Sequence, residues 1–67
     1  MKLDETKLQM ILAEKQMRLK DLYERSGVSD RALLDLRKGK TTPRPATIGR
    51  IAKALNVEVQ DIIQEGD

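Results

Sequence analysis

Charged side chains interrupt a row of leucines between residues 30 and 38, and these charged groups have the clearest chemical use in the chain. Arg31 carries a planar guanidinium that can donate two parallel hydrogen bonds to one partner. Asp30 and Asp35 carry carboxylates that accept hydrogen bonds from N–H donors. The chain has no His and no Cys, which removes the commonest general base, the usual zinc ligands and disulfides. The pattern therefore indicates recognition by hydrogen bonding rather than catalysis.

The residues around this segment predict two short helices joined by a tight turn. Leu22 faces inward from the first helix, and Gly27 stands at the turn because a residue without Cβ enters positive φ at no steric cost. Ser29 can cap the second helix by accepting a hydrogen bond from a backbone N–H. Leu33 and Leu36 lie on one face and would pack against Leu22. This arrangement predicts a helix-turn-helix over residues 18–38.

The second helix of this motif presents Asp30, Arg31, Leu34 and Asp35 away from the core. A short, rigidly held helix with a polar outer face fits the DNA major groove, which is about 12 Å wide. Arg31 is the first candidate for base reading, because a guanidinium can bond O6 and N7 of guanine together. The alternative is a solvated arginine paired with Asp35 one turn later. Both interpretations hold if Asp35 keeps Arg31 in its reading rotamer.

The two acids and the leucine on this face allow more than one interpretation. Asp30 lies in the first turn, where an acid complements the helix dipole, and we favour this role over a hydrogen bond from cytosine N4. Asp35 either reads cytosine or lowers nonspecific affinity for DNA, and the residues do not rank these alternatives. Leu34 can touch a thymine methyl group or a partner subunit.

Basic residues are concentrated after the predicted motif. Residues 1–36 hold seven basic and seven acidic side chains, whereas residues 37–53 hold six basic side chains and no acid. A basic block that begins where the motif ends is expected for a surface that binds phosphates, so Lys38 and Lys40 are predicted phosphate contacts. An ordinary local excess of charge is the alternative, and we favour it for Arg50 and Lys53.

Apolar spacing predicts an all-α fold of five helices without a strand. Asp4 or Thr6 would cap the first helix, and Gly39 would end the third helix at its C′ position. Pro45 suits the first position of the fourth helix, in which Gly49 costs about 1 kcal/mol against Ala. We attribute Gly49 to the close approach of a neighbouring backbone. The predicted helices span residues 4–15, 19–26, 30–38, 45–55 and 59–64.

The length of 67 residues predicts one small domain over residues 1–67. No apolar run approaches the roughly 20 residues that span a bilayer, and the N-terminus has no signal-peptide core. Together with the absence of cysteine, these features predict a cytoplasmic protein with no membrane partner. Five short helices leave little room for a pocket, so we expect no enzyme activity, cofactor, metal site or small-molecule substrate.

A series of elements without gaps between Leu8 and Ile63 extends the pattern over more than four-fifths of the chain. These elements are Leu22, Ser26-Gly-Val-Ser29, Leu33, Leu36, Gly39-Lys40 with Pro43, Ile51-Ala-Lys-Ala-Leu55, and Val57 before Asp61-Ile-Ile63. As a set they resemble the phage-repressor type of helix-turn-helix domain, the Cro-like or Xre family. The resemblance implies a compact five-helix, lambda-repressor-like domain that binds double-stranded DNA and regulates transcription.

The resemblance also implies which residues meet DNA. The base-facing positions of the family correspond here to Asp30, Arg31 and Asp35, with Ala32 and Leu34 alongside. Its phosphate contacts correspond to the start of the second helix and to the cap and loop that flank the third. These residues are Arg18, Ser29, Lys38, Lys40, Thr41 and Thr42, and Arg44 joins them by proximity.

The chain departs from the family pattern on the second and third helices. Arg18-Leu19 stand where the family has Thr or Ser followed by Gln, so the side-chain cap is lost, although Arg18 can replace the phosphate contact by charge. Tyr23 occupies a position that usually holds Ala, so its ring must angle outward or the two motif helices must spread. The third departure is the pair of acids, Asp30 and Asp35, on the reading face.

These observations predict a sequence-specific transcriptional regulator, a repressor that occupies its operator with the third helix in the major groove. Useful specificity requires two copies, which predicts a homodimer on half-sites about 34 Å apart. We expect Val59 and Ile62 to contribute to the dimer surface, and the dimer to be weak without DNA. The alternative is a protein-interaction or antitoxin-like module on the same fold with weak or lost DNA binding. The acids on the third helix and the missing Gln favour that alternative.

Overall fold

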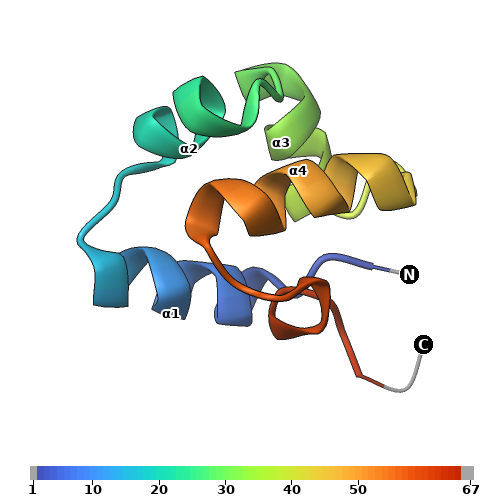
Figure 1. Cartoon of the computed structure of the whole chain (residues 1–67). Coiled ribbons are helices and arrows are strands. Elements are labelled where there is room, and N and C mark those ends of the chain that lie inside the picture. Colours follow the sequence, from blue (N-terminus) through green and yellow to red (C-terminus); the bar gives the residue numbers. More distant parts are fainter. Residues whose placement is uncertain (1, 66–67) are drawn as a thin grey trace.

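Four α-helices and one 3₁₀ turn follow one another in the computed structural model, which describes residues 2–65 (Figure 1). The described part of the chain contains no β-strand, as predicted, and one isolated antiparallel bridge joins Leu3 to Ile63. None of its helices has the length and apolar character needed to cross a lipid bilayer. The elements are α1 (Glu5–Lys15), α2 (Leu19–Ser26), α3 (Asp30–Arg37), α4 (Pro45–Leu55) and η1 (Val59–Asp61).

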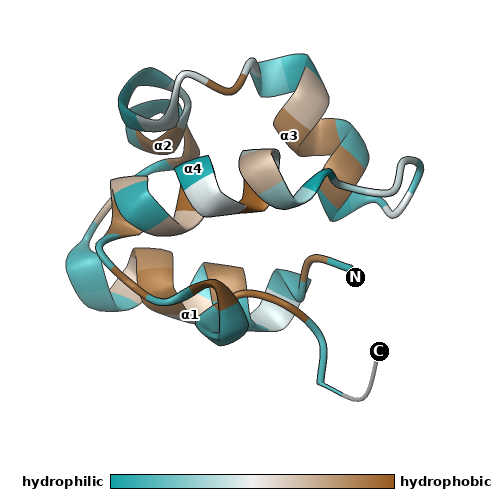
Figure 2. Ribbon diagram, turned by 45° about the vertical axis from the view of Figure 1, so that its right-hand side comes forward, coloured by the Kyte–Doolittle hydropathy of each residue, from teal (hydrophilic) through white to brown (hydrophobic). Residues whose placement is uncertain are grey.

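Helix α4 is the centre of the molecule. It runs between α2 and α3 on one side and α1 with the C-terminal segment on the other (Figures 1 and 2). Its buried residues Ile48, Ile51, Ala52 and Leu55 repeat at the spacing predicted for one helical face. The core thus forms around α4, which packs most closely against α2 and η1. The largest fully buried side chains are Leu8, Leu22, Leu33, Ile48, Ile51, Leu55 and Ile62.

The helix ends follow the local residue chemistry. Asp4 caps α1, because its Oδ1 accepts a hydrogen bond from the Lys7 N–H at 3.0 Å, while Thr6 lies within the helix. Helix α4 begins at Pro45 as predicted and ends before Asn56, which has a left-handed φ of 58°. Asn tolerates this conformation better than most residues, so it ends the helix without a glycine.

The last predicted helix, over residues 59–64, is instead a 3₁₀ turn of three residues. The backbone beyond this turn is used by the N-terminal segment: the Asp4 N–H donates to the Ile62 carbonyl at 2.8 Å, and the Gln64 N–H donates to the Lys2 carbonyl at 2.9 Å. Because these groups pair with another segment, they cannot continue a helix. The five-helix prediction is therefore wrong in its last element.

Three further expectations are corrected by the burial of a side chain, the space around a glycine and the end of a helix. Ile62 is fully buried, so it cannot form part of a dimer surface. A Cβ built on Gly49 would meet no neighbouring atom within 4 Å, so no close backbone approach explains this glycine. At the end of α3, Lys38 is the C-cap rather than a helical residue, one position earlier than predicted.

Candidate nucleic-acid interface

The inner face of the motif is a buried leucine cluster. Leu22 and Leu33 are fully buried and Leu36 is 7% exposed, so all three leucines that were predicted to face inward lie in the core. Gly27 has φ of 74°, and its N–H donates to the Tyr23 carbonyl at 3.1 Å. The predicted left-handed turn between α2 and α3 is therefore confirmed, and α3 is anchored along one side.

Two serines hold the turn in place, and sequence reasoning found only one of them. Ser29 caps α3 as predicted, because its Oγ accepts a hydrogen bond from the Ala32 N–H at 3.1 Å. Ser26 is buried, and its Oγ accepts from the Val28 N–H at 3.1 Å. A serine hydroxyl often accepts a hydrogen bond from the backbone N–H two residues further on, so Ser26 directly before the turn was the signal that could have predicted this bond.

The start of α2 replaces the lost side-chain cap by a different bond. Arg18 has no side-chain acceptor and makes no cap, as its type predicts. The Asp21 carboxylate instead accepts a hydrogen bond from the Arg18 N–H at 2.9 Å, which is half of a capping box. The Arg18 side chain is thereby left exposed at the helix start. Tyr23, one turn and a half further on, is half-buried and packs against the core.

The outer face of α3 carries the predicted base-reading residues. Arg31 is 79% exposed, and its Nε lies 3.6 Å from the Asp35 Oδ2 one turn later. Asp30 is exposed, and its Oδ1 accepts a hydrogen bond from the Arg31 N–H at 2.8 Å, a contact expected of an acid in the first turn. Ala32 is exposed, whereas Leu34 and Asp35 are half-buried. The face thus carries three charged side chains beside two apolar ones, and Arg31 extends into solvent.

The loop after α3 is attached to the helix by its own backbone. The Gly39 N–H donates to the Leu36 carbonyl at 3.2 Å and the Lys40 N–H donates to the Asp35 carbonyl at 2.9 Å, with Gly39 at φ of 73°. These two bonds form a Schellman motif, which confirms the C′ role of the glycine. The loop therefore leaves α3 in a defined direction. Its predicted phosphate contacts Lys38, Lys40, Thr41, Thr42 and Arg44 are all exposed.

A shallow hollow brings part of the loop beside the outer face of α3. Ala32 and Asp35 line one side of it, and Thr41, Thr42 and Arg44 line the other. Residues predicted for base reading and for phosphate contact thus share one surface. Arg18 belongs to a different element, and its side chain is not part of this hollow.

Arg37 differs from the other basic residues of its block, because it is tied to α1. Its Nε lies 3.0 Å from Oε1 and 3.1 Å from Oε2 of Glu5, and its Nη2 lies 2.9 Å from Oε1. Gln9 donates a further bond to the same carboxylate at 3.1 Å. Sequence reasoning missed this contact, since no local pattern relates residues 32 positions apart.

This contact changes the acid–base behaviour of both partners. The hydrogen bonds from Arg37 hold the pKa of Glu5 below its ordinary value of 4.5, although partial burial opposes the change. The hydrogen bond to Glu5 raises the pKa of Arg37. Each shift favours the charged form, so the pair stays ionised where a solvated pair would begin to titrate.

The whole helix-turn-helix and the loop that follows lie within one recognisable family signature. Residues 7–64 match the Cro/C1-type HTH DNA-binding domain. The chain belongs to this family. The assignment confirms the resemblance drawn from the sequence and makes the chain a DNA-binding helix-turn-helix protein, of a family that is typically not enzymatic. The chain has no match among curated proteins.

Within this Cro/C1-type HTH domain, α2 and α3 are the two helices of the motif, and the leucine cluster is its structural basis. The family assignment covers every residue that we predict to meet DNA, from Arg18 to Arg44. It does not assign a role to any single one of them. Those roles stay predictions, and they form part of the proposal that follows.

Proposed function

We propose that this protein is a sequence-specific regulator of transcription, of the Xre type, that represses by occupying its operator with α3 in the major groove. The observation that carries the proposal is the contrast between the two faces of α3. Leu33 and Leu36 are buried, whereas Arg31 is 79% exposed on the opposite side. A helix held this firmly can present a long side chain to base edges without losing its own packing.

In this proposal Arg31 bonds O6 and N7 of a guanine, and Asp35 orients it. Their 3.6 Å separation supports this division of roles, since Asp35 is half-buried while Arg31 extends into solvent. Ala32 and Leu34 supply apolar contacts beside it, and Asp30 is used by the backbone of its own helix. The proposed phosphate contacts are Arg18, Ser29, Lys38, Lys40, Thr41, Thr42 and Arg44.

We further infer a homodimer on the operator, because one short helix reads too few base pairs for useful specificity. Half-sites would lie about 34 Å apart, one helical turn of DNA. The partner is double-stranded DNA, so we place the protein in the cytoplasm. No catalytic step, cofactor or small-molecule substrate enters this proposal.

Selection of bound duplexes from a random pool tests the proposal directly. The expected result is an enriched site that contains a guanine at a constant position in each of two half-sites. The contrary result is a pool that stays random after repeated selection, although binding is measurable. Recovery of the same site with Arg50→Ala, an exposed arginine on α4, is the matched control.

The alternative function is a protein-interaction or antitoxin-like module with weak or lost DNA binding, and the acids Asp30 and Asp35 on α3 favour it. A salt series on a random duplex separates the two functions. For a DNA-binding protein, the logarithm of the affinity falls linearly with the logarithm of the salt concentration, with a slope of about −0.9 for each phosphate contact on duplex DNA. An interaction module that has lost DNA binding would show none even at low salt.

A further inference from the structure

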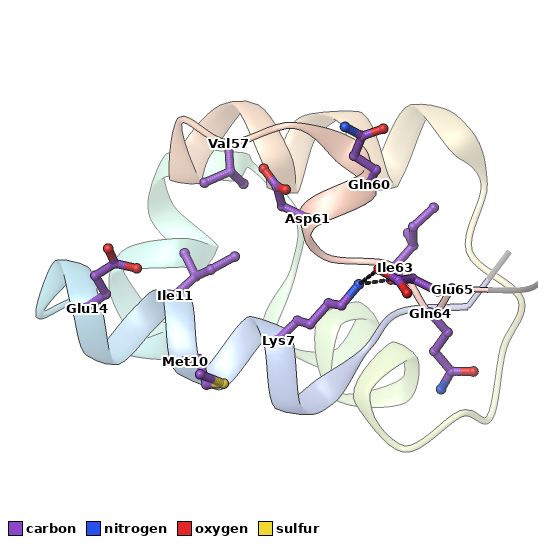
Figure 3. Close-up of a pocket in the computed structure, with 10 residues that line it drawn as sticks. All are labelled: Lys7, Met10, Ile11, Glu14, Val57, Gln60, Asp61, Ile63, Gln64 and Glu65. Carbon is purple, nitrogen blue, oxygen red and sulfur yellow. Dashed lines mark hydrogen bonds and ion pairs between the residues drawn. The ribbon is translucent and has the colours of Figure 1, made fainter.

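An open groove lies on the molecule between α1 and the C-terminal segment, away from the helix-turn-helix (Figure 3). Ile11, Val57 and Ile63 form its apolar lining, and each of these side chains is only partly buried against the core. Met10 lies on the rim and is 67% exposed, the one exposed large hydrophobic side chain within residues 2–65. The groove residues come from α1 and from the chain after α4, so none of them belongs to α3 or its loop.

The residues that α1 contributes to this groove form one stripe with a particular order. Lys7, Met10, Ile11 and Glu14 follow at spacings of three, one and three, which places them on one side of the helix. Along the helix the stripe is basic, apolar, apolar and acidic, and Lys7 and Glu14 lie equally far from the midpoint between Met10 and Ile11. When two such stripes lie antiparallel about a two-fold axis, Lys7 of each copy faces Glu14 of the other, and Met10 faces Ile11.

We propose that a second copy of this chain docks on this surface, through an antiparallel contact between the two α1 helices centred on Met10 and Ile11. The stripe of Lys7, Met10, Ile11 and Glu14 supplies both halves of the contact. This inference deepens the proposed function, because it adds an interface to the proposed homodimer, on a surface that shares no residue with the proposed DNA contacts.

The charges at the two ends of the stripe favour a second copy over another occupant. Lys7 is held over the groove by bonds from its Nζ to the Ile63 carbonyl at 3.2 Å and to Glu65 at 3.5 Å, which leaves one of its three N–H donors (Figure 3). Glu14 is exposed and makes no ion pair within residues 2–65. A partner copy meets both needs, since it brings an acid to Lys7 and a base to Glu14.

The size of the stripe sets the expected strength. One face of an eleven-residue helix buries much less than the interfaces of permanent dimers, so the self-association is weak and depends on concentration. Two exposed ion pairs flank its apolar centre, and each is worth a few tenths of a kcal/mol to about 1 kcal/mol. Reversing one charge replaces two attractive contacts by two repulsive ones, because every residue of a two-fold contact appears twice.

Sedimentation equilibrium without DNA tests the proposal with two single variants. Lys7→Glu has acids at both ends of the stripe and Glu14→Lys has bases at both ends, so each should dimerise about tenfold or more weakly than the parent chain. An equimolar mixture of the two should regain the parent dimerisation, because each acidic end then meets a basic one. Lys20→Glu and Glu24→Lys on α2 make the same charge changes at exposed positions outside the groove and should leave dimerisation unchanged.

Two results would overturn the proposal: a parent chain that stays monomeric at every concentration, or a mixture that associates no better than its components. Glu14→Lys removes no ion pair within residues 2–65, so it stays informative if Lys7→Glu unfolds. A separate titration of the parent chain with a random duplex tests DNA binding. If the duplex does not bind but the mixture of variants regains dimerisation, only the proposed function is contradicted. If the duplex binds but the mixture does not regain dimerisation, only the inference is contradicted.

Discussion

The two arginines of α3 stand at opposite ends of the helix and are held in opposite ways. Arg31, near the start, has one 3.6 Å contact with Asp35 and is 79% exposed. Arg37, at the end, makes three bonds of 2.9 to 3.1 Å with Glu5 and is 21% exposed. The same residue type therefore extends into solvent at one end of α3 and binds α1 at the other. The difference comes from the neighbouring element and not from the residue type.

The largest expected effect is on the reading end, where Arg31→Ala should remove the preference for one base pair. A bidentate arginine–guanine contact is worth roughly 1–3 kcal/mol of discrimination, which is about fivefold to 160-fold in relative affinity. Nonspecific affinity should fall only slightly. Competition between the selected duplex and its single-base variants measures this loss. A uniform loss over all sequences would show that Arg31 is a phosphate contact, and the comparison between the two arginines would fail.

The next effect is on the linking end, where Arg37→Ala should lower the free energy of unfolding by about 1 kcal/mol. The bonds are charge-assisted and bidentate, but partial exposure of both side chains reduces their net value. Urea unfolding of Arg37→Ala, Glu5→Gln and the double variant forms a double-mutant cycle. A coupling energy near zero would contradict the role of the pair, and Arg50→Ala should leave stability unchanged.

A smaller effect separates the two kinds of basic residue in DNA binding. Lys40→Ala should reduce the slope of log affinity against log salt by about 0.9, because one phosphate contact is lost. Arg37→Ala should leave this slope unchanged, since its guanidinium is already bound to Glu5. Fluorescence anisotropy with a random duplex over a range of salt gives both slopes. If Arg37→Ala reduced the slope as much as Lys40→Ala, the ion pair would have to open on DNA.

The smallest effect is a dependence of stability on pH from Glu5. Because its folded pKa is lowered, the ion pair contributes fully above the ordinary pKa of 4.5, and this contribution is lost as the pH falls through the folded pKa. Glu5→Gln should therefore lose less stability than the parent chain on acidification below about pH 4.5. Thermal unfolding of both chains at pH 7 and below pH 4 checks this, and parallel losses would contradict the assignment to Glu5.

Much of the motif could be predicted because its causes are local. Ser29, Gly27 and Gly39 act on backbone groups within a few residues of themselves, and the structure confirms all three roles. The leucine spacing in α3 and the apolar stripe in α4 required only helical periodicity. Arg18 was correctly predicted to make no cap, but the bond from its N–H to Asp21 was missed.

The failed predictions involve partners that are distant in the sequence. Residues 59–64 have an adequate helical pattern, yet the pairing of Ile62 and Gln64 with the N-terminal segment stops the helix after η1. The same packing buries Ile62 completely, which removes it from any dimer surface. Gly49 was assigned a packing role, and the space around it shows none.

By itself, the sequence determined where the helices of the motif begin, where they end to within one residue, and which of its leucines face inward, because caps and periodicity depend on neighbours only a few residues away. Tertiary structure alone decided that Arg37 binds Glu5 rather than solvent, and that the C-terminal segment leaves the helical conformation. Both outcomes depend on groups more than 30 residues apart that meet only after the helices have packed around α4.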